Sequence, residues 1–418
     1  MINKMKTVPE LRFSNFCDEW INYKLGEIVD IRGRIGFRGY TKSDIIDKEN
    51  GGILTFSPTN IISNKLKNTA HDTYITKEKY EESPEIMVKN GDILFVKTGS
   101  TLGKSTLVAN LNEEATVNPQ IVVMKVKDFF HQKFTSTYVT LNKILRQVAQ
   151  IRIGGAIPTL TESEIKKIQV NFPVYEEQEK IGTFFSKLDR QIELEEKKLE
   201  LLEQQKRGYI QQLYSQEIRF KDDKGENYPE WKLTELNAIF TKYKNTIYLK
   251  DEQEYKRISI SNRGIISHRD ITLGKEIGRK RQYVIDLNNH PNTLTFIRQG
   301  VFLGGIGFVP KFLNNYIVTE NMPLLSMDSK YNKLFMTYLF ESEDYYKNVI
   351  FKNLPIGSAQ KALHEKEWLQ STVSVPILEE QEKIGNFFNK TDNLIELQTK
   401  KIESLKQRKR GLLQKMFV

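Results

Sequence analysis

The feature that most constrains this chain is a seven-residue segment that occurs twice. "EEQEKIG" stands at Glu176–Gly182 and again, unchanged, 203 residues later at Glu379–Gly385. The similarity continues around it: of 39 aligned positions that start at Pro173 and Pro376, 24 are identical. Self-similarity at a long fixed period is the mark of an internal duplication. The chain is therefore expected to fold as two halves built on one plan.

Weaker similarities precede these segments in the same order. "NGDILFVKTGSTLGK" (residues 90–104) aligns with "QGVFLGGIGFVPK" (299–311), and "TVNPQIVVM" (116–124) aligns with "TENMPLLSM" (319–327). The duplication therefore includes the regions that precede each helical segment.

Those preceding regions mix strands with short helices. Runs of β-branched and aromatic residues, among them "DILFV", "QIVVMKV", "KIQVNFPV", "VFLGG" and "STVSVPI", predict strands. Residues 133–151 and 332–350 predict helices. The expected fold class is α+β, with a strand-rich region and then a long helix in each half.

The repeated segments are typical of long amphipathic helices. Their apolar residues recur on alternating three- and four-residue steps, the a/d pattern of a coiled-coil seam. The predicted seam residues are Ile181, Phe185, Leu188, Ile192, Leu199, Leu202, Tyr209 and Leu213 in the first copy and Ile384, Phe388, Ile395, Ile402, Leu405, Leu412 and Met416 in the second. A helix of this length extends roughly 58 Å at 1.5 Å per residue. A narrow apolar stripe along so long a helix cannot be buried by a small domain alone, so each helix needs a partner helix.

Each long helix could pair with either of two partner helices. The same helix of a second chain would give a homodimer. The other helix of the same chain is favoured, because one duplication supplies two matching seams at high effective concentration. Paired antiparallel, the two helices would place the strand-rich regions at opposite ends of a rod.

Charge and cysteine content narrow the class of protein. Lysine and arginine number 63 against 53 acidic residues, which gives a net charge of +10 and a pI of about 9.2. This balance favours a polyanionic partner such as nucleic acid. A single cysteine excludes an internal disulfide framework, and no apolar run approaches membrane-spanning length. We expect a cytoplasmic protein that does not enter a membrane.

Three motifs that suggest enzymes are incomplete. "GSTLGKS" at Gly99–Ser105 is one residue shorter than a phosphate-binding loop, so its backbone amides would not wrap a phosphate in the usual way. "VNPQ" at Val117–Gln120 matches only half of the Asn-Pro-Pro-aromatic signature of DNA methyltransferases. The five histidines show no metal-ligand spacing. We therefore expect no catalytic residue, no metal and no cofactor in this chain.

The two strand-rich regions, each closed by "FPVYEEQEKI" or "VPILEEQEKI" and a long helix, resemble the specificity subunit of type I restriction-modification systems. The resemblance covers essentially the whole chain, and "GGAIPTLTESEI" upstream of the first helix belongs to it. The second copy reads "GSAQKAL" there and lacks the proline.

The resemblance implies four segments in two pseudo-twofold repeats. Target-recognition domain 1 spans residues 1–171, the first helical region 172–216, target-recognition domain 2 217–374 and the second helical region 375–418. The two helical regions would form an antiparallel coiled coil, and each domain would read one half of a bipartite DNA sequence. Because the helices match closely while the domains have diverged, the target is expected to be asymmetric. Its half-sites should lie about one turn of the duplex apart.

The resemblance also implies partners that carry the chemistry. Two methyltransferase subunits would use S-adenosylmethionine, and restriction subunits would use ATP and Mg²⁺. The rival hypothesis is a DNA-binding repressor or architectural protein that acts without enzyme partners.

Candidate DNA contacts lie where basic residues mix with glycine, amide or aromatic residues. Arginine matches guanine, asparagine matches adenine, and lysine and hydroxyl groups suit phosphates. The predicted DNA-binding residues are Arg32, Arg34, Arg38, Tyr40, Lys42, Lys97, Ser100, Thr101 and Lys104 in the first domain and Asn262, Arg263, His268, Arg269, Lys280 and Arg281 in the second. Phe184 and Phe387, which lie beside the seams, are the predicted partner-binding residues.

Overall fold

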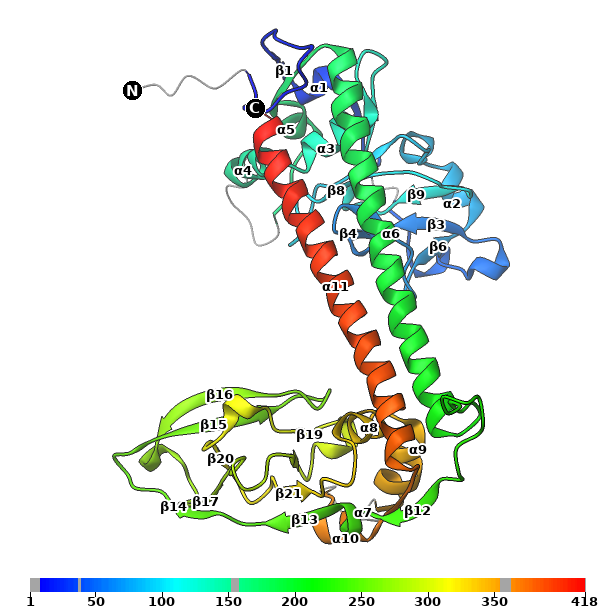
Figure 1. Ribbon diagram of the computed structural model, residues 1–418. Coiled ribbons are helices and arrows are strands. Elements are labelled where there is room, and N and C mark those ends of the chain that lie inside the picture. Colours follow the sequence, from blue (N-terminus) through cyan, green and yellow to red (C-terminus); the bar gives the residue numbers. More distant parts are fainter. Residues whose placement is uncertain (1–7, 37–38, 152–157, 354–361, 418) are drawn as a thin grey trace. The chain divides into compact units, whose positions relative to one another are not determined.

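The computed structural model describes residues 8–36, 39–151, 158–353 and 362–417. Contacts divide the chain into two compact units (Figure 1). Unit 1 comprises Met1–Glu196 with Lys401–Val418, and unit 2 comprises Lys197–Lys400. Each unit thus holds one strand-rich region and part of both long helices. The limits of the four predicted segments stay a prediction. Arg38 and most of "GGAIPTL" and "GSAQKAL" lie outside the described residues.

Unit 1 is built on a four-stranded sheet in the order β2-β10-β7-β8, with a three-stranded sheet β6-β3-β9 and the pairs β1-β11 and β4-β5. Its strands are β1 (Ile21–Lys24), β2 (Val29–Arg32), β3 (Ile53–Phe56), β4 (Ile61–Ile62), β5 (Lys65–Leu66), β6 (Thr73–Ile75), β7 (Ile93–Val96), β8 (Ser105–Leu107), β9 (Ala115–Val117), β10 (Ile121–Val126) and β11 (Gln169–Phe172). Its short helices are α1 (Leu25–Ile28), α2 (Lys77–Glu81), α3 (Gln132–Val139), α4 (Asn142–Ile151) and α5 (Glu162–Lys166). Strand β7 is a continuous apolar run because both of its faces are covered: Phe95 joins the helix-side core, and Leu94 joins the core beneath β3 and β9.

Unit 2 repeats this plan. The order β13-β21-β18-β19 matches the four-stranded sheet of unit 1, and β12-β22 matches β1-β11. Its strands are β12 (Lys232–Glu235), β13 (Phe240–Tyr243), β14 (Thr246–Tyr248), β15 (Glu254–Ile260), β16 (Ile266–Leu273), β17 (Arg281–Val284), β18 (Thr293–Phe296), β19 (Ile306–Phe308), β20 (Ile317–Val318), β21 (Leu324–Met327) and β22 (Thr372–Val375). Its short helices are α7 (Leu236–Ile239), α8 (Lys333–Leu339), α9 (Glu343–Tyr345) and α10 (Glu365–Gln370). The second sheet differs: unit 2 has the five-stranded order β14-β17-β20-β15-β16. The predicted α+β class and internal repeat are confirmed, and the divergence lies in this second sheet.

One predicted strand is wrong. "VFLGG" forms a short 3₁₀ turn, Val301–Leu303, and the strand that corresponds to β7 is β18. The turn ends at Gly304, whose φ of +98° favours glycine. A Cβ there would lie 2.1 Å from the carbonyl oxygen of Asn262, so the glycine allows two backbones to meet. The apolar letters suggested a strand because this close approach is not visible in the sequence.

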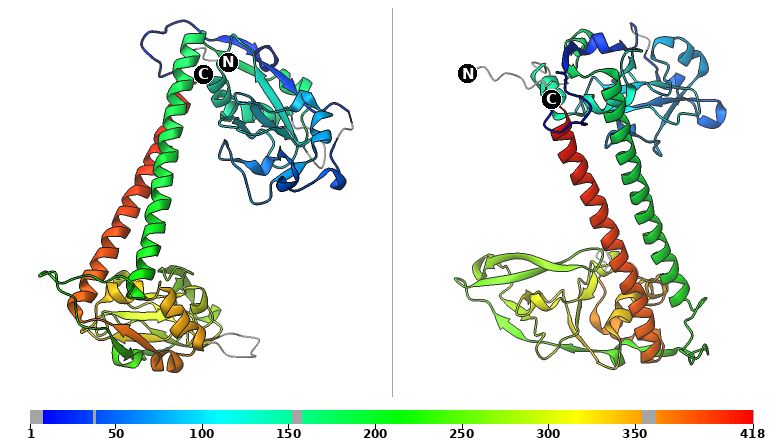
Figure 2. Two further views of the ribbon diagram at one scale, coloured as in Figure 1. Left: turned by 90° about the vertical axis from the view of Figure 1, so that its right-hand side faces the viewer. Right: turned by 45° about the horizontal axis from the view of Figure 1, so that its top comes forward.

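The long helices α6 (Tyr175–Tyr214) and α11 (Leu378–Met416) run antiparallel. In unit 1, Lys401 pairs with Glu195, and eight residues further along α11 Lys409 pairs with Asp189 on an earlier turn of α6, each at 2.5 Å. In unit 2, Lys206 lies 2.9 Å from a carboxylate oxygen of Asp392. Within each unit the helices lie side by side (Figure 2). The predicted pairing within one chain is confirmed.

The seam is buried at the start of each long helix and only partly buried in the middle, where Ile192 and Ile402 are covered and other seam residues are not. Ile181 and Ile384 are buried, whereas Leu199 and Ile395 are half-buried. One seam residue is misplaced: Tyr209 is 43% exposed, and Ile210 beside it is 2% exposed. The reason is that this end of α6 packs into the core of unit 2, together with Leu213 and Tyr214, so its buried face follows the domain rather than the strict heptad.

The repeated "EEQEKIG" segment anchors each long helix to its strand-rich region. In unit 1 the fully buried carboxylate of Glu177 accepts hydrogen bonds from Nε and Nη2 of Arg12, both at 2.7 Å. In unit 2 the equally buried Glu380 accepts from Nη2 of Arg219 at 2.7 Å and from Nε1 of Trp231 at 3.1 Å. A carboxylate that is shielded from solvent needs a positively charged side chain beside it, so the second glutamate of the segment anchors the long helix through its arginine.

The glutamine of the same segment positions a short helix. Oε1 of Gln178 accepts from the backbone N–H of His131, immediately before α3, at 2.9 Å. Oε1 of Gln381 accepts from the backbone N–H of Asn332, immediately before α8, at 2.8 Å. In both copies the amide nitrogen donates to the carbonyl of the proline five residues earlier. Each glutamine thus fixes the start of α3 or α8 against the long helix.

The glycine of the segment lets that short helix approach. A Cβ at Gly182 would lie 2.6 Å from the backbone nitrogen of Phe134, and one at Gly385 would lie 3.0 Å from that of Phe335. Gly208, further along α6, has open space around it. The second glutamate, the glutamine and the glycine of the segment thus make the same joint in both units: an ion-pair anchor, the start of a short helix and a close approach of that helix.

The end of α11 fills an aromatic core in unit 1. The ring of Phe417 lies 6.0 Å from that of Trp20 and 5.4 Å from that of Phe134. Tyr214, which stands 203 residues earlier, lies 6.2 Å from Trp231 in unit 2. The last described residue of the chain therefore occupies the place that the end of α6 occupies in the other unit.

The segment that enters each strand-rich region meets the helix end in the same way. The backbone N–H of Leu11 donates to the carbonyl of Lys415 at 2.9 Å. The backbone N–H of Ile218 donates to the carbonyl of Gln212 at 3.2 Å. In unit 2 the two bonded residues are only six positions apart, whereas in unit 1 they are 404 positions apart in the sequence.

A partly buried amine makes the stability of unit 1 depend on pH. Nζ of Lys143 donates to the hydroxyl of Tyr138, and burial lowers the pKa of Lys143 from 10.5 to about 7. Below pH 7 the amine is protonated in the folded and unfolded states, and the folded state bears the full cost of a buried charge. Between pH 7 and 10.5 the folded state has released the proton while the unfolded state still holds it, so rising pH favours folding.

We expect Lys143→Met to remove this dependence. From pH 7 to pH 10 the free energy of unfolding of the wild type should rise by about 1–2 kcal/mol relative to that of the variant, a value reduced because the side chain is only half-buried. Urea unfolding at several pH values measures this difference. A constant difference across the range would contradict the buried-amine account.

Candidate nucleic-acid interface

The basic loop after β2 is held against the sheet by one of its own arginines. Arg34 is half-buried, and its Nη2 donates to the carbonyl of Val117 on β9 at 3.1 Å. Its guanidinium lies 6.0 Å from the ring centre of Tyr40. Burial lowers the pKa of Arg34 and raises that of Tyr40. Arg32 and Lys42, in contrast, are exposed.

The glycine-bearing turn connects β7 to β8. Gly99 has a φ of +108° and Gly103 a φ of +85°, so both need glycine for a tight hairpin connection. Ser100 and Lys104 are exposed, and Lys97 and Thr101 are half-buried. The backbone N–H of Lys97 donates to the carbonyl of Gln120 at 2.8 Å. This turn is a connection between strands of one sheet.

The first domain therefore brings two of its predicted contact regions together. Arg34 binds the carbonyl of Val117, and Lys97 binds that of Gln120, three residues further on. The segment between β9 and β10 is the common support. The side chains of Arg32, Lys42 and Lys104 remain exposed.

In the second domain, Asn262 and Arg263 form the exposed tip of the β15-β16 hairpin. The tip is fixed by close backbone packing: a Cβ at Gly264 would lie 2.1 Å from the carbonyl oxygen of Ile306. His268 and Arg269 follow on β16, and the ring of His268 lies 5.8 Å from that of Tyr316.

The other predicted cations of this domain are exposed but paired with carboxylates. Lys280 pairs with Asp251 and donates to the carbonyl of Gly274 at 2.8 Å. Arg281 lies 3.7 Å from Glu320. Exposed pairs of this kind are weak and exchange readily for phosphate oxygens.

Two polar residues outside the predicted set, Gln299 and Asn321, line a cavity that Arg269 also lines. Gln299 follows β18, and Asn321 follows β20. The available signal was the alignment of "TENM" with "TVNP", which sets Asn321 opposite Asn118, beside the segment that supports Lys97.

The two predicted partner-binding residues are half-buried within their own units. The ring of Phe184 lies 6.2 Å from that of Phe13. The ring of Phe387 lies 5.6 Å from that of Tyr209 and 5.5 Å from that of Phe220. Part of each ring is thus covered by its own chain, and a role toward a partner stays a prediction.

Over the described ranges, we find no group of three or more histidine, cysteine, aspartate and glutamate side chains arranged to hold a metal ion. Within the same ranges, no helix is both long and apolar enough to span a membrane.

This architecture is similar to that of known proteins. The chain is 22% identical to the type I restriction enzyme MjaVIII specificity subunit of Methanocaldococcus jannaschii, over 98% of this chain and 95% of that protein. It is 21% identical to the putative MjaX specificity subunit of the same organism, with the same coverage. The crystal structure of the S subunit of a type I restriction-modification system from M. genitalium has the same fold, with a TM-score of 0.57 at 16% identity over 98% of this chain and 99% of that one.

The family described as type I restriction modification DNA specificity domain matches this chain twice, over residues 17–204 and 228–407. Each match begins near the first strand of a unit and ends within a long helix, so the structural repeat of the chain coincides with the repeat of the family. Since the two matches together cover well over half of the sequence, the protein belongs to the type I restriction modification DNA specificity family.

Proposed function

We propose that this protein is the subunit that gives a type I restriction-modification complex its DNA sequence specificity, and that each half of the chain reads one half of an interrupted, asymmetric target. The observation that carries the proposal is a contrast within each unit: the joint between long helix and strand-rich region is alike in the two units, whereas the second sheet is not. In both units the buried glutamate of the joint, Glu177 or Glu380, accepts a hydrogen bond from Nη2 of an arginine at 2.7 Å. The second sheets, in contrast, differ in the number and order of their strands.

This contrast is what two different readers on a shared frame require. Sequence is read by side chains that reach base edges, so two half-sites of different sequence need two different sets of side chains. The frame does not read bases and has no reason to diverge. Exposed cations such as Arg32, Lys104 and Arg263 supply the phosphate and base contacts in this proposal.

The partners are proposed from the names of the relatives and from the absence of an enzyme motif in the sequence. Two methyltransferase subunits would bring S-adenosylmethionine and modify adenine, and restriction subunits would bring ATP and Mg²⁺. The two matching long helices offer one docking surface for each methyltransferase, with Phe184 and Phe387 beside it. The proposed role of this chain is to select the site at which those enzymes act.

A methylation map tests the proposal. This chain is expressed with the methyltransferase encoded beside it, in a host without DNA methylation, and the genomic DNA is sequenced for N6-methyladenine. We expect one interrupted, asymmetric motif that disappears when this chain is omitted. Replacing Arg32 and Lys42 by alanine should weaken methylation of that motif.

The same experiment separates the rival function. A repressor or architectural protein would bind DNA tightly alone and would leave no methylation motif. If the methyltransferase modifies DNA with another specificity subunit but produces no motif with this one, the proposed function is wrong.

A further inference from the structure

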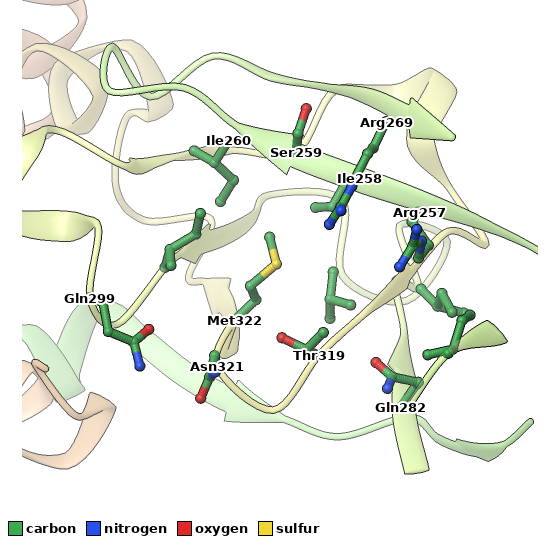
Figure 3. A pocket seen from close by; sticks show the side chains of 14 residues that line it. Arg257, Ile258, Ser259, Ile260, Arg269, Gln282, Gln299, Thr319, Asn321 and Met322 are labelled. Carbon is green, nitrogen blue, oxygen red and sulfur yellow. The ribbon is translucent and has the colours of Figure 1, made fainter. Parts of the chain in front are cut away.

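The second domain contains a cavity of about 350 Å³ beside Arg269 (Figure 3). It opens among β15, β16, β17 and β20 and the loops that follow β18 and β20. Its floor is apolar and buried, made by Ile258, Val318 and Met322. Gln299 and Asn321 line one side, and Arg257 lies on the other. This volume falls within the roughly 300–1,000 Å³ of small-ligand sites, where an apolar lining and a few polar groups define the ligand.

The loops that carry the two amides are held in place. The backbone N–H of Arg298 donates to the carbonyl of Asn321 at 3.0 Å, which ties the loop after β18 to the loop after β20. Nη2 of Arg298 in turn donates to Glu365 at 2.6 Å. A site whose backbone is fixed before binding loses less conformational entropy when a ligand arrives.

The side-chain amides of Gln299 and Asn321 have no hydrogen-bond partner among the described residues, and both side chains are exposed. Neighbouring amides of the same domain are used differently: Asn289 donates to Asp286 at 2.7 Å, and Asn314 accepts from the N–H of Leu287 at 2.8 Å. The fold thus uses some amides to build its turns and leaves these two available.

The arginine on the opposite wall is already engaged. Nε and Nη2 of Arg257 donate to the two carboxylate oxygens of Asp270, at 2.7 and 2.8 Å. Its fork is therefore unavailable for the two acceptors of guanine. Arg269 lies 3.3 Å from the same carboxylate and is exposed, so it is free to move toward a phosphate.

We infer that the second recognition domain reads an adenine in this cavity, with the side-chain amides of Gln299 and Asn321 as specificity-determining groups. An amide offers a donor and an acceptor side by side, which matches the N6 amine and a ring nitrogen of adenine. The apolar floor would receive the face of the base or the methyl group of the paired thymine. The inference rests on the proposed function and names the side chains that would carry it in one domain.

The matching region of the first domain has the same construction. There the backbone N–H of Lys97 donates to the carbonyl of Gln120, as that of Arg298 does to Asn321. Parallel pairing of β3 with β9 in one unit and of β15 with β20 in the other supports the two regions alike. Both domains thus present polar side chains where the loop after one central strand meets the loop before another.

The methylation map supplies the first test. We expect the complex that carries Gln299→Ala together with Asn321→Ala to accept other bases at one adenine position of the second half-site, with a loss of selectivity of roughly 5- to 100-fold. The first half-site should stay unchanged and serves as an internal control for folding. Asn245→Ala, which alters an exposed amide of the same domain outside the cavity, should leave the whole motif unchanged.

The outcomes separate the inference from the function on which it rests. If the wild-type chain yields no motif, the proposed function fails. If the wild type yields a motif and the double variant yields the same one, this inference is wrong. If the double variant abolishes methylation, sequence selection from a random DNA pool decides: uniform weakening across all sequences overturns the inference, and loss of preference at one adenine supports it.

Modified bases show how the adenine is presented. In the wild-type complex, 7-deazaadenine at that position should weaken binding if the groove edge is read, and permanganate oxidation of the opposite thymine should rise if the adenine turns out of the duplex. Neither response should occur in the double variant. The absence of both responses in the wild type would overturn the inference.

Discussion

Replacing Arg219 by methionine will lower the free energy of unfolding by about 3–5 kcal/mol. Glu380 has no exposed surface and depends on Arg219 for two of its hydrogen bonds, so the variant leaves a buried charge without its cation. Urea unfolding, followed by the fluorescence of the nearby Trp231, measures the loss.

Two further variants separate charge from packing. Adding Glu380→Gln to Arg219→Met should restore most of the stability, because the amide is neutral and still accepts the hydrogen bond from Trp231. Lys400→Met removes an exposed pair with Glu396 and should change stability by less than about 0.5 kcal/mol. Equal effects of Arg219→Met and Lys400→Met would contradict the anchor.

Phe417→Ala will cost about 3–4 kcal/mol, although it alters a residue at the very end of the sequence. Phe417 is 8% exposed and contacts four aromatic rings of unit 1, so its removal leaves a cavity in an aromatic core. Thermal unfolding of the variant measures the loss. Phe312→Ala is the matched control, because Phe312 is 69% exposed. An unchanged melting temperature for Phe417→Ala would show that the C-terminal residues do not hold the core together.

The sequence predicted the long helices well because their signal is local. The seam residues recur every three or four positions, and Ile181 and Ile384 are buried as expected. The seam was wrong at Tyr209, where the packing of a distant core displaced the heptad. Periodicity within a helix does not report which surface the helix meets at its end.

The sequence could not predict the joints or the cavity, because their parts are far apart in the chain. Arg12 and Glu177 are separated by 165 positions. Gln299 and Asn321 line one cavity, and a hydrogen bond from the backbone N–H of Arg298 to Asn321 joins the loops that carry them. For the same reason "VFLGG" was taken for a strand: the approach of Asn262 to Gly304 depends on a hairpin that begins 50 residues earlier. The basic loops could be proposed from the sequence because their charged residues and glycines are adjacent in the chain, and their role in binding DNA stays a prediction.

The division of unit 1 between the two ends of the sequence affects the order of synthesis. Residues up to Glu196 leave the ribosome long before Lys401–Val418 are made. At roughly 5–20 residues per second, the interval is roughly 10–40 s. During that time Trp20 and Phe134 lack the ring of Phe417, whereas Tyr214 is translated before Trp231 and the strands of unit 2. Unit 1, whose first residues are synthesised before those of unit 2, is therefore expected to complete its core last. A nascent chain that stalls before Phe417 would expose the aromatic residues of unit 1, which chaperones can bind.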